Sequence, residues 1–149
     1  MSFIAEIGLN HNENFGLVHE LVRQAVNSNA DIAKFQLGWR SRKGELNFIS
    51  PDTLRRIVGI VDHYGIEVMF SIISEEAYKA VKRFAFQRYK IASRTVKDNP
   101  NLVKKILDEG KETYISLVFW DGDDVPFKDW DNARYLWCKS LYPAAPWVA

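Results

Sequence analysis

Short, nearly continuous apolar runs alternate along this chain with longer segments in which apolar residues recur every three or four positions. A run without polar alternation is typical of a parallel strand that is covered on both faces. The runs cover residues 3–9, 31–37, 66–71, 88–92, 113–119 and 135–141. Their starts are about one βα unit apart, roughly 20 to 35 residues. The pattern therefore predicts six strands.

The segments between the runs predict four amphipathic helices, because their apolar residues share one helical face. These stripes fall within residues 17–26, 54–61, 77–84 and 102–107. A side chain that can cap a helix precedes a proline at Ser50 and at Asn99, which favours helix starts there. Gly65 and Gly110 follow the stripes at positions where a left-handed residue commonly ends a helix.

Strand and helix in regular alternation imply an α/β fold with right-handed crossovers, either an open doubly wound sheet or a (β/α) barrel. The turn after the first run reads LNHNENFG and contains neither GxGxxG nor GxxxxGK. A dinucleotide site or a P-loop is therefore not favoured. The alternation weakens over residues 122–132, which are polar and aromatic and predict no helix.

Composition indicates one globular domain or a part of a larger one. The 149 residues are 47% hydrophobic and 13% aromatic, enough for a sizeable core. A formal charge of +1 lacks the basic excess of nucleic-acid-binding proteins. The single cysteine, Cys138, excludes an internal disulfide, so we expect a cytoplasmic protein. No signal peptide and no apolar stretch of about 18 residues is evident, so no membrane association is expected.

Polar residues near the C-terminal ends of the predicted strands are the candidate functional groups, because parallel α/β folds place their sites there. Lys34 and Lys90 are the most informative, since each interrupts an apolar strand, IAKFQL and RYKIAS. A buried lysine without an anionic partner is unfavourable or loses its charge. Together with the hydroxyls of Ser71, Ser93 and Ser116, the two lysines would suit a small dianion such as a phosphate ester with a carboxylate.

The lysines also have a second interpretation, in which they reach the rim of the sheet or pair with Glu6. Glu6 lies within an apolar strand and is a candidate general acid or base, or an acceptor for sugar hydroxyls. The other polar residues near strand ends are Asn10, His11, Gln36, Ser140 and Tyr142.

Metal ligation by the three histidines is not favoured. His19 and His63 lie within predicted helices and have no ligand three or four residues away. His11 follows the first strand and is a candidate substrate contact or a residue that fixes the loop by a hydrogen bond. Cys138 is expected to pack beside Trp137 and not to act as a nucleophile, because no activating histidine is near it in sequence.

Five ordered segments of the chain resemble the sialic acid synthases, a family that includes N-acetylneuraminate, pseudaminic acid and legionaminic acid synthases. The first segment, AEIGLNHNENFGLVHELVRQAVNSNADIAKFQ, resembles the family's AEIGxNHxG followed by GADxxKFQ. GIEVMFSIISEEA, YKIASRTVKDNPNLVKKI, GKETYISLVF and LWCKSLYPAAP resemble GIxFxSTPFD, KIASGExxNxPLL, GKPVILSTGM and LLHCTSxYPTP. The match runs in collinear order along nearly the whole chain.

The resemblance implies a (β/α)8 barrel of the TIM type that condenses phosphoenolpyruvate with an N-acetylated amino sugar. The family uses a divalent metal, Mn²⁺ or Mg²⁺, and releases phosphate. Carried over by motif, the residues that hold phosphoenolpyruvate would be Lys34, Lys90, Ser93 and Ser116.

The sugar acceptor would be faced by Glu6 and Gln36, with Asn10 and His11 in the adjoining loop. Tyr142 would lie between the two substrates. Glu6 and Tyr142 are therefore the candidate catalytic residues.

The chain also departs from the family pattern. The family's metal-binding histidines come from strands beyond the YP motif, so we expect the metal ligands to be absent from this chain. Ile72 replaces the threonine of STPFD, Leu117 and Val118 replace the last two residues of STG, and WCK stands in place of HCT. The loop over residues 38–50 is shorter than its family counterpart, which leaves the identity of the sugar open.

We therefore expect residues 1–149 to form about six units of an incomplete (β/α)8 barrel, without the C-terminal barrel units and the antifreeze-like domain. One hypothesis is a truncated or diverged synthase that is inactive alone. The alternative is a non-catalytic anion-binding or assembly module derived from the same barrel. Unpaired first and sixth strands would favour association, as in a homodimer, through exposed Phe3, Ile4, Trp137 and Leu141.

Overall fold

The computed structural model describes residues 2–37, 43, 48 and 50–138. This part of the chain contains six strands and five helices. The strands are β1 (Ile4–Gly8), β2 (Ile32–Leu37), β3 (Glu67–Ile72), β4 (Arg88–Ile91), β5 (Glu112–Ser116) and β6 (Ala133–Leu136). The helices are α1 (Phe15–Asn27), α2 (Pro51–Tyr64), α3 (Glu75–Val81), α4 (Ser93–Asp98) and α5 (Pro100–Leu107).

The predicted helix ends are confirmed by their local geometry. The Ser50 side chain accepts a hydrogen bond from the Thr53 amide at the start of α2, and Asn99 caps α5 in the same way. Gly65 ends α2 with φ at 68°, in the left-handed region that favours glycine. The helix α4 was not predicted, because it has six residues and Ala92 at its start offers no capping side chain.

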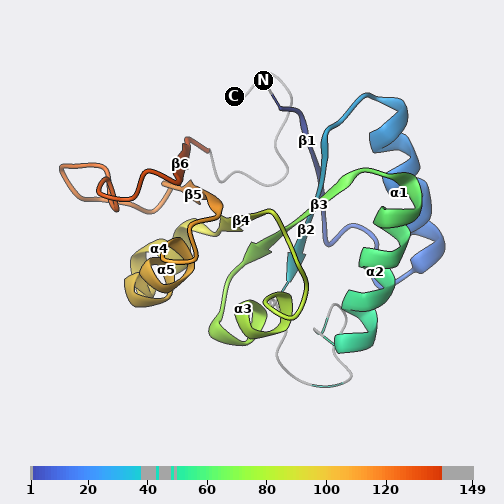
Figure 1. Ribbon diagram of the computed structural model, residues 1–149, viewed down its shortest axis with the longest axis horizontal. Coiled ribbons are helices and arrows are strands. Elements are labelled where there is room, and N and C mark those ends of the chain that lie inside the picture. The colour runs from blue at the N-terminus through green and yellow to red at the C-terminus, as the bar shows by residue number, and fades with distance from the viewer. Residues whose placement is uncertain (1, 38–42, 44–47, 49, 139–149) are drawn as a thin grey trace.

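The six strands form one parallel sheet in the order β1-β2-β3-β4-β5-β6, so that strands adjacent in sequence are also adjacent in the sheet. The helices follow an arc around the outer, convex side of this sheet (Figure 1). The described sheet does not close on itself, and β1 and β6 form its two ends. The expected architecture, an incomplete barrel of the (β/α)8 type, is therefore confirmed.

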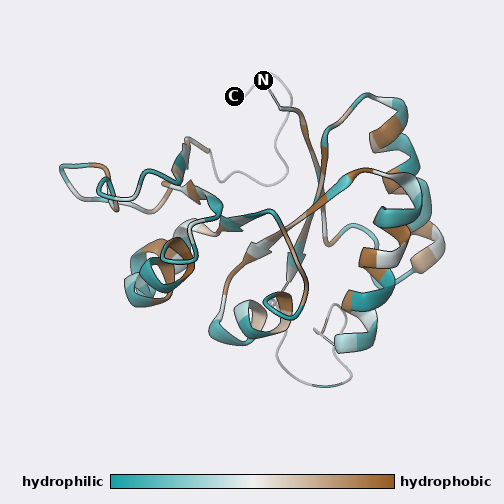
Figure 2. Ribbon diagram, in the orientation of Figure 1, coloured by the Kyte–Doolittle hydropathy of each residue, from teal (hydrophilic) through white to brown (hydrophobic). Residues whose placement is uncertain are grey.

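The outer face of the sheet carries the main core. Side chains such as Phe35, Phe70, Ile72 and Ile91 are fully buried and pack in one cluster with apolar helix residues. Figure 2 shows hydrophobic positions along the strands and on the helix sides that face them. Because strand residues alternate between faces, the side chains at the intervening positions project from the inner face.

The last two predicted strands have different bounds in the structure. The run over residues 113–119 ends as a strand at Ser116, because the chain turns there and the Trp120 amide donates to the Leu117 carbonyl. The sixth strand starts at Ala133, two residues before the predicted run, because Ala133 pairs in register with Thr113. Over the described ranges, no helix has both the length and the apolar character needed to cross a membrane.

Candidate functional site

The parallel register gathers polar side chains from several strands on the inner face of the sheet. Lys34 on β2 is in register with Met69 on β3, and Ser71 on β3 is in register with Lys90 on β4. Residues in register project to the same face, and so do residues two apart on one strand. Lys34, Ser71 and Lys90 therefore share the inner face, and Ser116 on β5 joins them by the same alternation.

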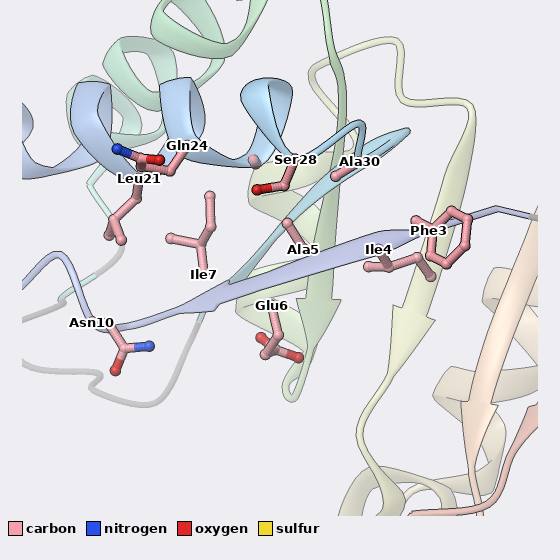
Figure 3. A pocket seen from close by; sticks show the side chains of 11 residues that line it. Phe3, Ile4, Ala5, Glu6, Ile7, Asn10, Leu21, Gln24, Ser28 and Ala30 are labelled. Carbon is pink, nitrogen blue, oxygen red and sulfur yellow. The ribbon is translucent and has the colours of Figure 1, made fainter. Parts of the chain in front are cut away.

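Lys34 is buried, with 7% of its surface exposed, and its ammonium forms an ion pair with the Glu6 carboxylate on β1. The two residues are in register, which brings them to the same face. The Glu6 side chain remains 61% exposed. Figure 3 shows Glu6 on the side of β1 opposite to Ile7, which points toward α1. The pairing of a strand lysine with Glu6, expected as the alternative to an anion site, is thus confirmed for Lys34.

Lys90 is in a different position, because no carboxylate in the described part of the chain lies within ion-pair distance of it. The pKa of the Lys90 ammonium is lowered to about 8, chiefly by burial and also by the positive charge of Lys34, while Glu6 and Cys138 act in the opposite direction. The inner face therefore holds a second lysine, Lys90, whose charge is disfavoured by burial and by Lys34. An anion bound beside Lys90 would favour its charged form.

The three serines of the predicted site are all buried. Ser71 and Ser116 lie near the C-terminal ends of β3 and β5, and Ser93 is the first residue of α4, directly after β4. The Ser116 Oγ lies 3.7 Å from the Cys138 Sγ. Cys138 is exposed, and so is Trp137, so the expectation that Cys138 has a packing role beside Trp137 is wrong. Its sulfur lies instead at the C-terminal end of the inner face, beside a candidate ligand-binding hydroxyl.

His11 fixes the loop after β1, one of its two expected roles. Its Nδ1 accepts a hydrogen bond from the Glu13 amide over 3.1 Å, and its ring lies edge-on to Phe35 with 5.8 Å between centroids. Burial lowers the His11 pKa, which favours the neutral imidazole that can accept this bond. Asn12 and Glu13 both have positive φ, so the loop is tightly turned. A sugar contact by His11 stays a prediction.

The other expected sugar-side residues are placed only in part. Gln36 projects from the inner face of β2, two residues beyond Lys34, and is partly buried. Asn10 is exposed in the turn after β1. Tyr142 and Ser140 lie outside the described residues, as does most of the loop over residues 38–50.

The residues that the structure describes do not fit a divalent metal centre. No group of three or more histidine, cysteine, aspartate or glutamate side chains gathers among them. The rings of His19 and His63 are 6.4 Å apart, but they come from α1 and α2 on the outer side of the sheet. The metal implied by the resemblance thus has no ligand set among the residues that the structure describes.

One feature of the inner face was not singled out from the sequence. At the N-terminal ends of the strands, Arg88 pairs with Glu67 over 2.6 Å and with Glu112 over 2.9 Å, and Arg134 lies 3.6 Å from Glu112. These residues are polar positions at the starts of otherwise apolar runs, which is the signal that could have indicated them. This ion network occupies the N-terminal end of the inner face, opposite to the end where Ser71 and Ser116 lie.

A groove of about 360 Å³ lies elsewhere, along the end strand β1 and beside α1 (Figure 3). Its lining includes Phe3, Ala5 and Ile7 from β1, and Leu21 and Gln24 from α1. Neither Lys34 nor Lys90 lines it. The groove therefore does not contain the lysine pair, although Glu6 and Asn10, two of the expected sugar-side residues, are also in its lining.

Sequence comparisons give one partial match. A family model described as "Prephenate dehydrogenase, dimerization domain" matches residues 50–118, which is less than half of the chain. In the structure this segment runs from α2 to β5 and supplies three of the parallel strands. No curated protein matches the sequence.

Several solved structures share the fold. N-acetylneuraminic acid (sialic acid) synthetase from Leptospira borgpetersenii, crystallised with citrate, aligns with a TM-score of 0.81 and 21% identity over 97% of this chain and 56% of its own. Phospho-2-dehydro-3-deoxyheptonate aldolase from Thermotoga maritima aligns with a TM-score of 0.67 and 15% identity, over 81% of this chain and 35% of its own. A putative spore coat polysaccharide biosynthesis protein E from Chromobacterium violaceum aligns with a TM-score of 0.66 and 20% identity, over 80% of this chain and 41% of its own.

The chain thus spans about half of the first of these proteins and less of the other two. At these identities the likeness shows the fold. The resemblance to the sialic acid synthases, predicted from the five motifs, is confirmed at that level by the shared architecture.

Proposed function

We propose that this chain is part of a sialic acid synthase-type barrel, and that the inner face of its sheet binds phosphoenolpyruvate. One observation carries this proposal: Lys34 and Lys90 share a face on which Glu6 is the only carboxylate paired with either of them in the described structure. Two ammonium groups against one carboxylate leave the site with excess positive charge. A small ligand with a phosphate and a carboxylate would balance it.

The buried serines suit the same ligand. Ser71, Ser93 and Ser116 come from three consecutive βα units and lie toward the C-terminal ends of the strands, where barrels bind substrates. Their hydroxyls would donate to phosphate oxygens once the lysines have drawn the anion in.

We further propose that phosphoenolpyruvate bound on this face condenses with an N-acetylated amino sugar. The exposed Glu6 carboxylate, Gln36 and Asn10 would face the sugar, and Tyr142 would lie between the substrates. In the reaction, the enol carbon of phosphoenolpyruvate attacks an open-chain sugar aldehyde, and water adds to the carbon that carried the phosphate. The divalent metal would take its ligands from outside residues 2–138, and we place the reaction in the cytoplasm.

Calorimetric titration with phosphoenolpyruvate tests the binding step. We expect one site per chain, weakened by salt because the attraction is electrostatic. Lys34→Ala and Lys90→Ala should each abolish binding, whereas Lys104→Ala, an exposed lysine of α5 on the outer side, should leave it unchanged. Unchanged binding in both site variants would reject the proposal.

A second readout separates the two hypotheses about this chain. Formation of a nine-carbon keto acid from phosphoenolpyruvate and N-acetylmannosamine, with added Mn²⁺, would favour the enzyme. Saturable binding of phosphoenolpyruvate without any product would favour the non-catalytic anion-binding module.

A further inference from the structure

We propose that Lys90 is also a nucleophilic amine, which condenses with the carbonyl group of a small 2-oxo acid to form an imine on the inner face of the sheet. The inference concerns the same inner face as the proposed function, but it uses the uncharged form of the lysine. It does not require that phosphoenolpyruvate binds.

The geometry distinguishes Lys90 from Lys34. Lys34 has a carboxylate partner in Glu6, whereas the residues in register with Lys90 on both sides, Ser71 and Tyr114, carry hydroxyl groups. The titratable groups that act on it from other strands are Lys34, Glu6 and Cys138, and Glu6 is paired with Lys34. Hydroxyl neighbours accept and donate hydrogen bonds but do not neutralise an ammonium. The surroundings of Lys90 therefore disfavour its protonated form.

The electrostatic consequence agrees with this arrangement. Burial and, to a smaller extent, the charge of Lys34 lower the pKa of Lys90 to about 8, against the smaller opposing effects of Glu6 and Cys138. At pH 7 roughly a tenth of such a lysine is uncharged, compared with about one part in 3,000 for an ordinary lysine. A lysine next to a second cation in a desolvated site is a recognised way to make an amine nucleophilic.

The same pair of lysines selects the ligand class. Lys34 lies on the same inner face and acts electrostatically on Lys90, so a carboxylate adjacent to the reacting carbonyl would have a cation to pair with. The Lys90 Nζ forms a bond to the carbonyl carbon, and the carbonyl oxygen takes up protons and leaves as water. The product is an imine, and no oxidant or reductant takes part.

Pyruvate is the probe for the test. The protein is incubated with pyruvate and sodium borohydride, which reduces an imine to a stable amine, and the modified lysine is located by peptide mass spectrometry. We expect one reduced pyruvate adduct, on Lys90, with a yield that rises as pH increases through about 8. Lys34→Met should slow the labelling at pH 7 by at least about tenfold, because the variant removes a cation that lowers the Lys90 pKa and that would pair with the carboxylate of pyruvate.

Two controls make the result decisive. Lys90→Arg keeps the charge and should lose the adduct, and Lys104→Arg should keep it. Labelling spread over exposed lysines, or unchanged at its site in Lys90→Arg, would overturn the inference. Locating the reduced adduct in the wild-type protein identifies the modified lysine even if a variant fails to fold. Binding of phosphoenolpyruvate without a pyruvate adduct overturns this inference alone, and an adduct without that binding supports it while the proposed function fails.

Discussion

Lys34 and Lys90 project from the same face of the sheet, yet within the described structure only Lys34 is paired with a carboxylate. This asymmetry links the stability of the fold to its proposed ligand. The charge on Lys90 is costly in the unliganded protein and becomes favourable when an anion binds. Charged residues in binding sites commonly lower the stability of the free protein because they serve its function.

Lys90→Met should therefore stabilise the protein at neutral pH. The folded pKa of Lys90, about 8, lies below its unfolded value near 10.4, so the unfolded chain binds the proton more tightly. The destabilisation is fully present below about pH 8 and is relieved as pH rises toward 10.4. We expect a gain of about 2 to 3 kcal/mol at pH 7 from chemical denaturation. An equal gain at pH 7 and pH 10.5 would contradict this assignment.

The carboxylate of Glu109 should carry acid sensitivity. It accepts hydrogen bonds from Tyr78 and from Tyr89 (3.0 Å) and pairs with Lys82 over 2.9 Å. Burial alone would raise the Glu109 pKa, but the hydrogen bonds from these groups lower it to about 2. The folded value lies below the unfolded one, so this stabilisation is present above about pH 4.5 and is lost as pH falls toward 2.

Glu109→Gln should accordingly cost on the order of 2 to 3 kcal/mol at pH 7 and much less at pH 2. The matched control is Glu20→Gln, which alters an ion pair on the surface of α1 with both side chains 48% exposed. Denaturant unfolding across this pH range gives both values. A pH-independent difference between wild type and Glu109→Gln would show that packing, not charge, explains the loss.

Loss of Arg88, the central residue of the ion network at the N-terminal ends of the strands, should lower the stability of the protein. Arg88→Met leaves Glu67 and Glu112 without their shared cation on a face where all three side chains are partly buried. We expect a loss of roughly 2 to 4 kcal/mol. Arg55→Met, which breaks an exposed pair with Asp52, should change stability by less than about 0.5 kcal/mol. Similar effects of the two substitutions on the denaturation midpoint would refute this role of Arg88.

The ends of the sheet should promote self-association. Phe3 is 62% exposed at β1, and Trp137 is 91% exposed just after β6, as expected from the sequence, whereas Ile4 is partly buried and Leu141 lies outside the described residues. Sedimentation should show association that grows with concentration and weakens in Phe3→Ser. Phe119→Ser alters another exposed aromatic residue, 43% exposed, which is not on β1 or β6, and serves as the control. A monomer at all concentrations would contradict the prediction.

The order of elements and most helix ends could be predicted from the sequence, because they depend on local chemistry. Ser50 and Asn99 cap the helices that they were expected to cap, and Gly65 has the left-handed backbone that its position indicated. The helix α4 lacked both a capping side chain and sufficient length, so no local signal marked it.

The site could be predicted only as a set of residues. The sequence placed Lys34 and Lys90 within strands, but either lysine could have paired with Glu6, and the choice depends on register. Register puts Glu6 directly beside Lys34 and puts Ser71 and Tyr114 beside Lys90. Pairing between strands is a non-local property, so the difference between the two lysines became evident only in the folded sheet.

A crystal structure of the protein with phosphoenolpyruvate bound tests the central claim most directly. We predict the ligand on the inner face of the sheet, with anionic oxygens within ion-pair distance of the Nζ atoms of Lys34 and Lys90 and within hydrogen-bond distance of the Ser116 hydroxyl. Phosphoenolpyruvate in the groove between β1 and α1, or anywhere else away from both lysines, would contradict the account.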